Sequence, residues 1–305
     1  MPALLKPHAV RIGATLGIAA PGGAVDSDLL QAGVALLEGC GFRIRMRDDV
    51  HARHRYLAGD DARRAGELAE LVADPKVEAI LVARGGYGCD RIIPRLDAAA
   101  FRAARKPLVG YSDVTALLLW QRRCAGLVGF HGPMLERGAD VDPAVLDALI
   151  GALAGAPAAP LRGTPRSGGA ATGRLVGGSL TLVAASIGTS WEIDTRGAIL
   201  LLEDRFERPY RIDRMLQQLR GAGKLEPLVA VGLGDFSSCV DERYPGLDAE
   251  QLVAEEIAPL GIPLVTGLPF GHVKENHPWP MGCRAKLDGD RGELRILERG
   301  VSVAP

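Results

Sequence analysis

Apolar and polar residues alternate along the first half of the chain in a pattern that predicts strands separated by helices. Short apolar runs predict five strands, at residues 15–19, 43–47, 78–83, 107–110 and 127–131. Between them, apolar residues three or four positions apart predict helices, at residues 27–39, 61–72, 90–96, 114–124 and 143–155. Such alternation favours right-handed crossovers and a mostly parallel sheet that helices cover on both faces.

The second half has a mixed pattern, which follows a change in composition. Residues 154–169 are rich in Ala, Pro and Gly without an apolar period, which predicts a linker or a long crossover between domains at 1–153 and 170–305. In the second domain, apolar runs predict strands, at residues 198–202, 228–233 and 263–267. Helices are predicted after Ser179, after Pro209 and at 248–257, and a β-hairpin at 284–287 and 293–297.

Composition narrows the class of protein. The 305 residues exceed the usual size of one core, and 47% apolar residues exclude a disordered chain. Lys and Arg number 36 against 37 acidic residues, so we expect no nucleic-acid partner and no attraction to anionic lipid. The five cysteines are scattered without a CxxC pair, which indicates neither a disulfide framework nor a zinc site and favours a reducing, cytoplasmic setting.

The N-terminal region loosely imitates a secretory signal, because Lys6, His8 and Arg11 precede an apolar stretch at 12–20. Glycines interrupt this stretch, and it continues into Pro21-Gly22-Gly23 as a strand continues into a loop. We therefore interpret it as the first core strand. No apolar run approaches the roughly 20 residues of a membrane helix, and we expect no membrane partner.

The tetrapeptide Gly110-Tyr111-Ser112-Asp113 joins a predicted strand to a predicted helix. A serine on such a turn exposes its hydroxyl near unpaired backbone N–H groups at the positive end of the helix. This placement favours a nucleophile. The full elbow motif has a second glycine where this chain has Val114, so an ordinary N-cap serine is the alternative.

The loop Arg84-Gly85-Gly86-Tyr87-Gly88 follows the predicted strand at 78–83 directly. Its glycines allow the backbone to approach a ligand, and their N–H groups can hold an anion. The loop matches neither dinucleotide-binding nor phosphate-binding motifs. It is either a tight turn without a ligand or, if Ser112 is a nucleophile, a second donor to its oxyanion hole.

Two further residues that end predicted strands could complete a catalytic group. Glu203 follows the strand at 198–202 and could orient a histidine, although an ion pair with Arg205 or Arg208 is the simpler interpretation. His272 follows the strand at 263–267 on a glycine-containing loop. Three other features bear on this site, namely the competing histidines His277 and His131 and the spacing of His51 and His54, which does not suit a zinc protease.

Together, a serine, an acid and a histidine each end a strand, where sites form in α/β sheets. In such a group the histidine takes the hydroxyl proton, and the carboxylate orients the ring and stabilises the imidazolium. The sequence therefore favours Ser112, Glu203 and His272 as a catalytic triad. We expect no metal and no cofactor.

The order of seven motifs resembles the LD-carboxypeptidase family of serine peptidases, which includes muramoyltetrapeptide carboxypeptidase. The resemblance extends from Ile18 to Gly282. The motifs are Ala20-Pro21-Gly22-Gly23, Arg84-Gly85-Gly86-Tyr87-Gly88, Gly110-Tyr111-Ser112-Asp113, Phe130-His131-Gly132-Pro133, Gly177-Gly178-Ser179-Leu180, Leu202-Glu203-Asp204 and Pro269-Phe270-Gly271-His272.

This resemblance implies an N-terminal flavodoxin-like parallel sheet with helices on both faces and a smaller, mixed α/β C-terminal domain. It also implies a cytoplasmic, homodimeric enzyme of peptidoglycan recycling that removes the terminal D-alanine from murein tetrapeptides. The nucleophile would be Ser112, the acid Glu203 and the base His272. The oxyanion donors would be the backbone N–H groups of Asp113 and Gly86, with Gly85 as the alternative to Gly86.

Candidates for substrate binding are Arg84, Tyr87, His131 and Trp191. An exopeptidase must recognise a free carboxylate, for which Arg84 is suited, whereas Trp191 could stack on a ligand or simply be buried. Two rival functions remain open. One is an immunity-type amidase that cleaves aminoacyl-nucleotides such as microcin C with the same triad. The other is a non-catalytic two-domain protein that binds a small molecule, in which Glu203 and His272 would lie far apart.

Overall fold

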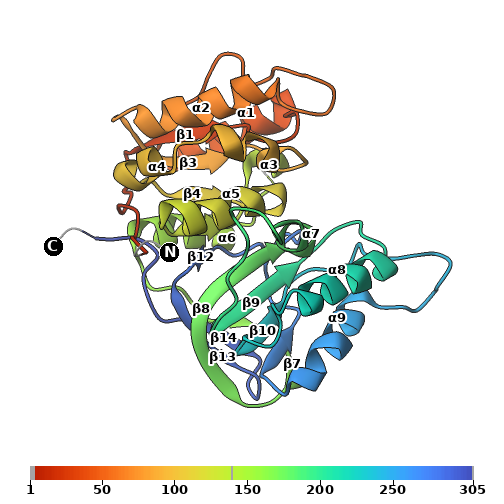
Figure 1. The fold of residues 1–305 in the computed structure, drawn as a ribbon. Coiled ribbons are helices and arrows are strands. Elements are labelled where there is room, and N and C mark those ends of the chain that lie inside the picture. Colours follow the sequence, from red (N-terminus) through yellow and green to blue (C-terminus); the bar gives the residue numbers. More distant parts are fainter. Residues whose placement is uncertain (1–3, 139, 304–305) are drawn as a thin grey trace.

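The computed structural model describes residues 4–138 and 140–303, which form two β-sheets with helices packed around them (Figure 1). The first sheet, in the upper half of Figure 1, has the strand order β12-β5-β4-β3-β1-β2. Its strands are β1 (Thr15–Ala19), β2 (Arg43–Arg45), β3 (Val77–Val82), β4 (Leu108–Gly110), β5 (Gly129–His131) and β12 (Trp279–Met281). β1 to β5 are parallel in the flavodoxin order 2-1-3-4-5, which confirms the expected fold class.

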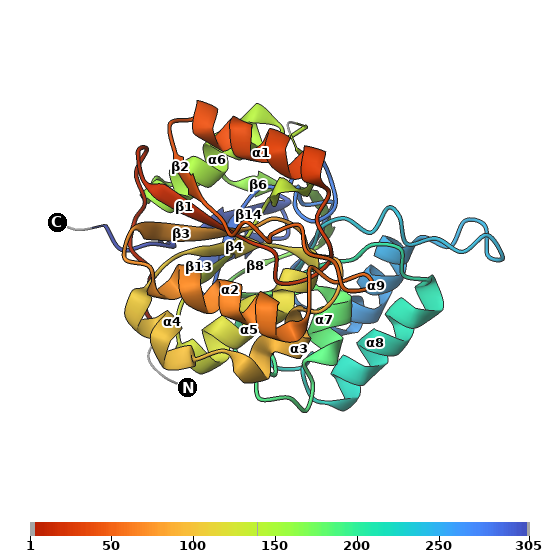
Figure 2. The ribbon, with the colours of Figure 1, turned by 90° about the horizontal axis from the view of Figure 1, so that it is seen from above.

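Helices cover both faces of this sheet (Figure 2). On one face lie α1 (Ser27–Gly39) and α6 (Pro143–Ala154), and on the other α2 (Asp61–Ala73), α3 (Cys89–Ile92), α4 (Ala98–Ala104) and α5 (Thr115–Trp120). Strand β3 shows why, because its successive side chains enter different cores. Ala79 and Leu81 pack with α1 and α6, whereas Ile80 and Val82 pack with the helices opposite.

The second sheet has the order β6-β14-β13-β8-β9-β10-β11-β7. Four of its strands form a parallel centre, β8 (Ala170–Ser179), β9 (Ala198–Glu203), β10 (Ala230–Leu233) and β11 (Leu264–Thr266). The flanking strands pair antiparallel, and they are β6 (Leu161–Arg162), β7 (Thr164–Ser167), β13 (Arg284–Asp288) and β14 (Glu293–Ile296). Its helices are α7 (Leu180–Ala185), α8 (Pro209–Gly221) and α9 (Ala249–Ile257).

Several elements lie where the sequence pattern did not predict them. The segment 154–169, expected to be a linker or a long crossover, contains the edge strands β6 and β7. Helix α4 and the glycine-rich strand β8 were not predicted, because neither has a clear apolar period. Strand β12 comes late in the chain yet pairs antiparallel with β5 of the first sheet. The predicted helix at 114–124 begins two residues earlier, as a tight turn.

Tight helical turns complete the chain. They are η1 (Ile93–Arg95), η2 (Ser112–Val114), η4 (Leu135–Arg137) and η5 (Ala258–Leu260), with one wider turn, η3 (Gln121–Ala125). Among the described residues, no helix has the length and apolar character needed to cross a bilayer.

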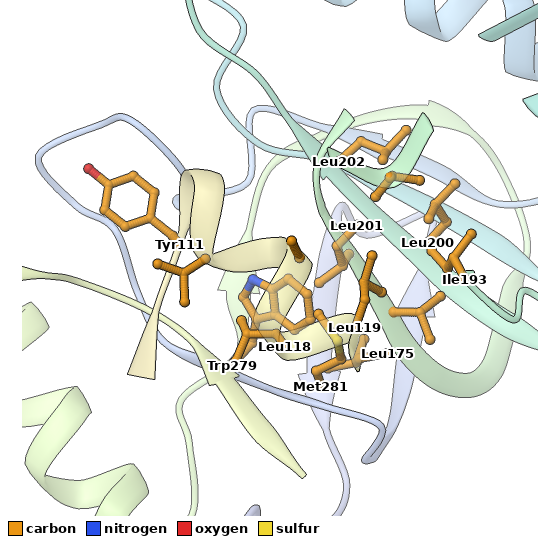
Figure 3. Close-up of a cluster of buried hydrophobic side chains, with 14 of the residues drawn as sticks. Tyr111, Leu118, Leu119, Leu175, Ile193, Leu200, Leu201, Leu202, Trp279 and Met281 are labelled. Carbon is orange, nitrogen blue, oxygen red and sulfur yellow. The ribbon is translucent and has the colours of Figure 1, made fainter. Parts of the chain in front are cut away.

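A single hydrophobic cluster joins the two sheets, which is what brings the candidate residues together. Figure 3 shows Trp279 and Met281 of β12 in this cluster with Leu200 to Leu202 of β9, and Leu118 and Leu119 of α5 belong to it as well. Trp279 and Met281 are fully buried. The C-terminal ends of β4, β5 and β9 are therefore held near one another.

Candidate active site

Ser112 lies on the turn between β4 and α5, where η2 begins. Its φ of +59° is in the left-handed region, which a residue with a side chain seldom adopts. Such a backbone costs about 1–3 kcal/mol and concentrates at functional sites. The N-cap position of the turn is occupied by Tyr111, so Ser112 does not have the geometry of an ordinary capping serine.

Gly110 explains how the turn forms although Val114 replaces the second glycine of the elbow motif. A Cβ at Gly110 would lie 2.8 Å from Cγ1 of Val114. The valine side chain therefore packs directly over the α-carbon of Gly110. Because Gly110 has no side chain, this close packing is possible, and the turn stays tight although Val114 replaces the second glycine of the motif.

The glycine loop lies against the serine turn. A Cβ on Gly85 would lie 3.2 Å from Cβ of Ser112 and 3.4 Å from the backbone nitrogen of Asp113, and Gly86 has a φ of +83°. The Asp113 carboxylate accepts a hydrogen bond from Cys89 N at 2.8 Å and is buried, so the Asp113 side chain serves the fold. Burial raises the pKa of this carboxyl group. The backbone groups of Asp113 and the loop are thus placed beside Ser112.

Glu203 and His272 form a hydrogen-bonded pair across 69 residues of sequence, with 2.7 Å between Glu203 Oε2 and His272 Nδ1. Glu203 is the last residue of β9 and is fully buried. Gly271 permits the approach, because a Cβ there would lie 2.9 Å from Glu203 Oε2, and its φ is +101°. Neither Arg205 nor Arg208 pairs with Glu203 among the described residues, so the simpler ion-pair interpretation is not realised.

The charges of the pair are linked. Burial would raise the pKa of Glu203, but the imidazoles of His131 and His272 outweigh it and hold this pKa at about 2. Burial lowers the pKa of His272. The hydrogen bond to Glu203 and the charge of that carboxylate raise it by more, so the pKa is shifted upward from 6.5. The arrangement favours an ionised carboxylate that supports a basic imidazole.

Tyr111 connects the serine turn to the histidine loop. Its ring centroid lies 4.9 Å from that of His272, in an edge-to-face arrangement, and its hydroxyl donates to Glu136 Oε1 at 2.5 Å. Burial and the charge of Glu136 raise the pKa of the Tyr111 phenol. The described residues show no hydrogen bond between Ser112 Oγ and His272, a contact that often forms in hydrolases only when substrate binds.

The loop that carries His272 is fixed at three points. Arg137 Nη2 donates to the carbonyl oxygen of His272 at 3.1 Å, from the first half of the chain. Asn276 Oδ1 accepts from Gly271 N at 2.9 Å, and the backbone of residue 277 donates to Pro269 O at 3.0 Å. Sequence reasoning missed Arg137 and Asn276, because no spacing connects them to the histidine before the chain is folded.

A cavity of about 450 Å³ adjoins Tyr111. Its wall carries three arginines and two acids, namely Arg84, Arg137, Arg205, Asp26 and Glu136. Arg84 Nη1 also donates to the carbonyl oxygen of Ala24 at 2.6 Å. A site of this composition can accept an anionic ligand next to the serine turn.

The other candidates for substrate binding occupy different environments. Tyr87 is 45% exposed, with its ring edge-on to Tyr56 at 5.7 Å. Trp191 is 6% exposed in the hydrophobic cluster, which favours the buried-tryptophan interpretation over stacking on a ligand. His131 is fully buried and cannot contact a substrate as the structure stands.

Asp204 is a second buried carboxylate beside the pair, and its role is structural. It accepts hydrogen bonds from Thr181 N at 2.7 Å and Arg205 N at 2.8 Å, so it caps the start of α7. Burial and the charge of Glu203 raise the pKa of Asp204 to about 6.

Known proteins resemble this chain over nearly its whole length. The chain is 34% identical to the murein tetrapeptide carboxypeptidase of Pseudomonas aeruginosa, over 90% of this chain and 94% of that protein. The crystal structure of muramoyltetrapeptide carboxypeptidase from Oxalobacter formigenes superposes with a TM-score of 0.84 at 32% identity, covering 93% of this chain and 98% of that one.

A second group of similar proteins consists of self-immunity proteins against microcin C7. The microcin C7 self-immunity protein MccF of Escherichia coli is 26% identical over 99% of this chain and 98% of that protein. The structure of MccF with glutamyl sulfamoyl guanosine superposes with a TM-score of 0.90 at 23% identity, over 98% and 100% of the two chains, a likeness of fold.

The match to the family itself covers both halves of the chain. Residues 16–132 match the LD-carboxypeptidase N-terminal domain, and residues 172–287 match the LD-carboxypeptidase C-terminal domain. The chain therefore belongs to the LD-carboxypeptidase family and is a serine-type carboxypeptidase.

Proposed function

We propose that this enzyme removes the terminal D-alanine from murein tetrapeptides through an acyl-enzyme on Ser112. The observation that carries the proposal is the buried Glu203–His272 pair, which contacts the serine turn through Tyr111. The substrate is inferred from the relatives named for murein tetrapeptides and muramoyltetrapeptides. Ser112, Glu203 and His272 act as nucleophile, acid and base in this scheme.

In the first step, Ser112 Oγ attacks the carbonyl carbon that precedes D-alanine, while His272 Nε2 takes the hydroxyl proton. The oxyanion accepts hydrogen bonds from the backbone N–H groups of Asp113 and Gly86. His272 then gives the proton to the departing nitrogen, and the C–N bond breaks. Water, deprotonated by His272, hydrolyses the serine ester and restores the hydroxyl group.

Recognition of the terminal carboxylate is assigned to the arginine-lined cavity. Arg84 and Arg137 already donate to backbone carbonyl oxygens. Within residues 4–138 and 140–303, the Arg205 side chain has no ion pair or hydrogen bond and stacks over the Phe206 ring at 4.2 Å. Arg205 is thus the cation best placed to bind a free carboxylate, a role for which Arg84 was the expected candidate.

The test is the release of D-alanine from L-Ala-γ-D-Glu-meso-diaminopimelate-D-Ala, followed by mass spectrometry. Ser112→Ala should reduce kcat by about 10⁴-fold or more, because the nucleophile is lost, and should leave the unfolding midpoint nearly unchanged. Tetrapeptide turnover at the wild-type rate in Ser112→Ala would contradict the mechanism. Failure of the folded wild-type enzyme to release D-alanine would contradict the substrate.

The likeness to the microcin self-immunity protein supports a second candidate, an amidase that cleaves aminoacyl-nucleotides with the same residues. The two functions separate when the tetrapeptide and an aminoacyl sulfamoyl adenosine are assayed side by side. We expect the tetrapeptide to have the higher kcat/KM, and the reverse order would favour the amidase.

We also propose that the enzyme is a cytoplasmic homodimer. The five cysteines are free, three of them buried, which suits a reducing compartment. Light scattering of the purified chain should give twice its mass of 32.2 kDa, and fractionation of the source cells should place it with cytoplasmic markers.

A further inference from the structure

His131 is a fully buried histidine whose polar atoms are unused. It ends β5, and among the described residues neither of its ring nitrogens has a hydrogen-bond partner. Glu203 Oε1, also fully buried, has no hydrogen-bond partner either. A buried polar group left unpaired costs about 1–3 kcal/mol, so a packing role alone does not explain a histidine here.

Two of these unpaired atoms face each other. His131 Nε2 lies 4.0 Å from Glu203 Oε1, while the other carboxylate oxygen, Oε2, is bonded to His272. A charge-assisted hydrogen bond needs about 2.7–2.9 Å, so a shift of roughly 1 Å would join the two groups. The carboxylate would then be held between two imidazoles.

Aromatic neighbours fix the His131 ring in the orientation that this contact requires. It stacks on Trp279, with ring centroids 4.9 Å apart and planes inclined by 13°. The rings of Tyr111 and Phe270 meet its edge at 5.9 Å and 5.7 Å. The side chain therefore has little freedom to turn away from the acid.

We propose that His131 is a positioning residue, whose neutral imidazole donates from Nε2 to Glu203 Oε1 and so aims Oε2 at His272. The inference rests on the proposed triad. Burial lowers the pKa of His131, which is consistent with a neutral ring that donates one proton. This contact replaces the expected role of His131 in substrate binding, since the residue has no exposed surface.

Removing the donor would change the charge that His272 experiences. Other titratable and charged groups also face the pair, namely Tyr111, Glu136, Arg137, Asp204 and Arg205. Without the His131 donor, the Glu203 carboxylate would have one hydrogen bond fewer and would attract the proton of His272 more strongly, so the imidazolium form would be favoured. The pH at which kcat/KM falls on the acidic side should therefore move upward.

The test compares His131→Phe, which keeps an aromatic ring, with His131→Gln, which keeps an N–H donor. We expect His131→Phe to lower kcat/KM by about 10–100-fold, as is typical when a residue that orients a functional side chain is lost. The acidic limb of the kcat/KM profile should move to higher pH. His131→Gln should keep most of the wild-type kcat/KM and most of the wild-type pH profile. His8→Phe, a change in an exposed histidine that contacts neither Glu203 nor His272, is the matched control and should keep wild-type kinetics.

Wild-type kinetics and pH profile in His131→Phe, or equal defects in the Phe and Gln variants, would overturn the proposal. Nitrogen-15 spectra of the histidine-labelled wild-type enzyme give a measurement that needs no variant. We expect a neutral His131 ring protonated at Nε2, and protonation at Nδ1 alone would refute the contact. This readout holds even if the substrate is not a murein tetrapeptide.

Discussion

The turn that carries Ser112 and the loop that carries His272 are built in different ways. The serine turn is local, because Gly110 and Val114 shape it and the neighbouring glycine loop at 84–88 supports it. From the second half of the chain, Ser179 N donates to Thr115 Oγ1 just beyond the turn at 3.1 Å, and the Tyr111 ring meets that of His272. The histidine loop depends on partners from far away, since Arg137 and Glu203 contact His272 across 135 and 69 residues of sequence.

This difference indicates how each part should fail. Ser112→Ala should remove chemistry without disturbing the second sheet, because among the described residues the hydrogen bond from that sheet goes to Thr115 and not to the Ser112 side chain. A change near His272 should alter geometry and pKa together, because the same contacts that place the ring also set its charge. Pre-organisation in the second region therefore depends on packing between the sheets, through Trp279 and its buried neighbours.

Glu203→Gln should have the largest effect on the histidine side. The pKa of His272 is raised from 6.5, so the wild-type acidic limb of kcat/KM should lie above 6.5, with activity lost as the pH falls through it. In the variant the carboxylate charge is gone, so burial becomes the dominant effect and lowers the pKa of His272. We expect kcat/KM to fall about 10⁴-fold and the residual activity to have its acidic limb at lower pH.

Asp204→Asn is the matched control for this experiment, because it neutralises a neighbouring buried carboxylate that does not contact His272. Because Asp204 acts on the pair only through the charge of Glu203, the acidic limb of Asp204→Asn should move much less than that of Glu203→Gln. A Glu203→Gln enzyme with an unmoved limb would show that His272 is not coupled to this acid.

Gly271→Ala should come next, with a loss of about 100-fold in kcat. Its Cβ would lie 2.9 Å from Glu203 Oε2 at a φ of +101°, so the ring and the carboxylate must separate, and a misplacement of about 1 Å can cost this much. Gly267→Ala in the same loop has a φ of +64° and nothing within 4 Å, so it isolates backbone strain from the collision. Equal kinetic defects in the two variants would contradict the role of close approach.

Much of the first region could be predicted from sequence, because its signals are local. The strand at 15–19, the helix starts at residues 27 and 61, and the placement of Ser112 after a strand all follow from nearby residues. Val114 was the one departure from the elbow motif, and its packing over Gly110 accounts for it.

The second region could be predicted only in part. Glu203 and His272 stood out because each ends an apolar run, but their contact was expected only through a chemical argument and a family resemblance. The burial of His131 under Trp279 depends on β12, a three-residue strand that pairs with the first sheet and has no period to reveal it. Contacts between turns and loops from different halves of the chain, such as that of Arg137 with His272, leave no pattern along the sequence.

The smallest effect concerns the cavity that lies between these two regions. Arg205→Met should raise KM for the free tetrapeptide by about 10–100-fold with little change in kcat, because a hydrogen-bonded charge contributes about 1.5–3 kcal/mol. The same substitution should abolish most of the preference for the free acid over a C-terminal amide. Arg214→Met is the control, since Arg214 likewise stacks on an aromatic ring, Tyr210, but does not line the cavity. If Arg205→Met still prefers the free acid over the C-terminal amide, Arg84 or Arg137 must recognise the carboxylate instead. Specificity would then depend on the first half of the chain.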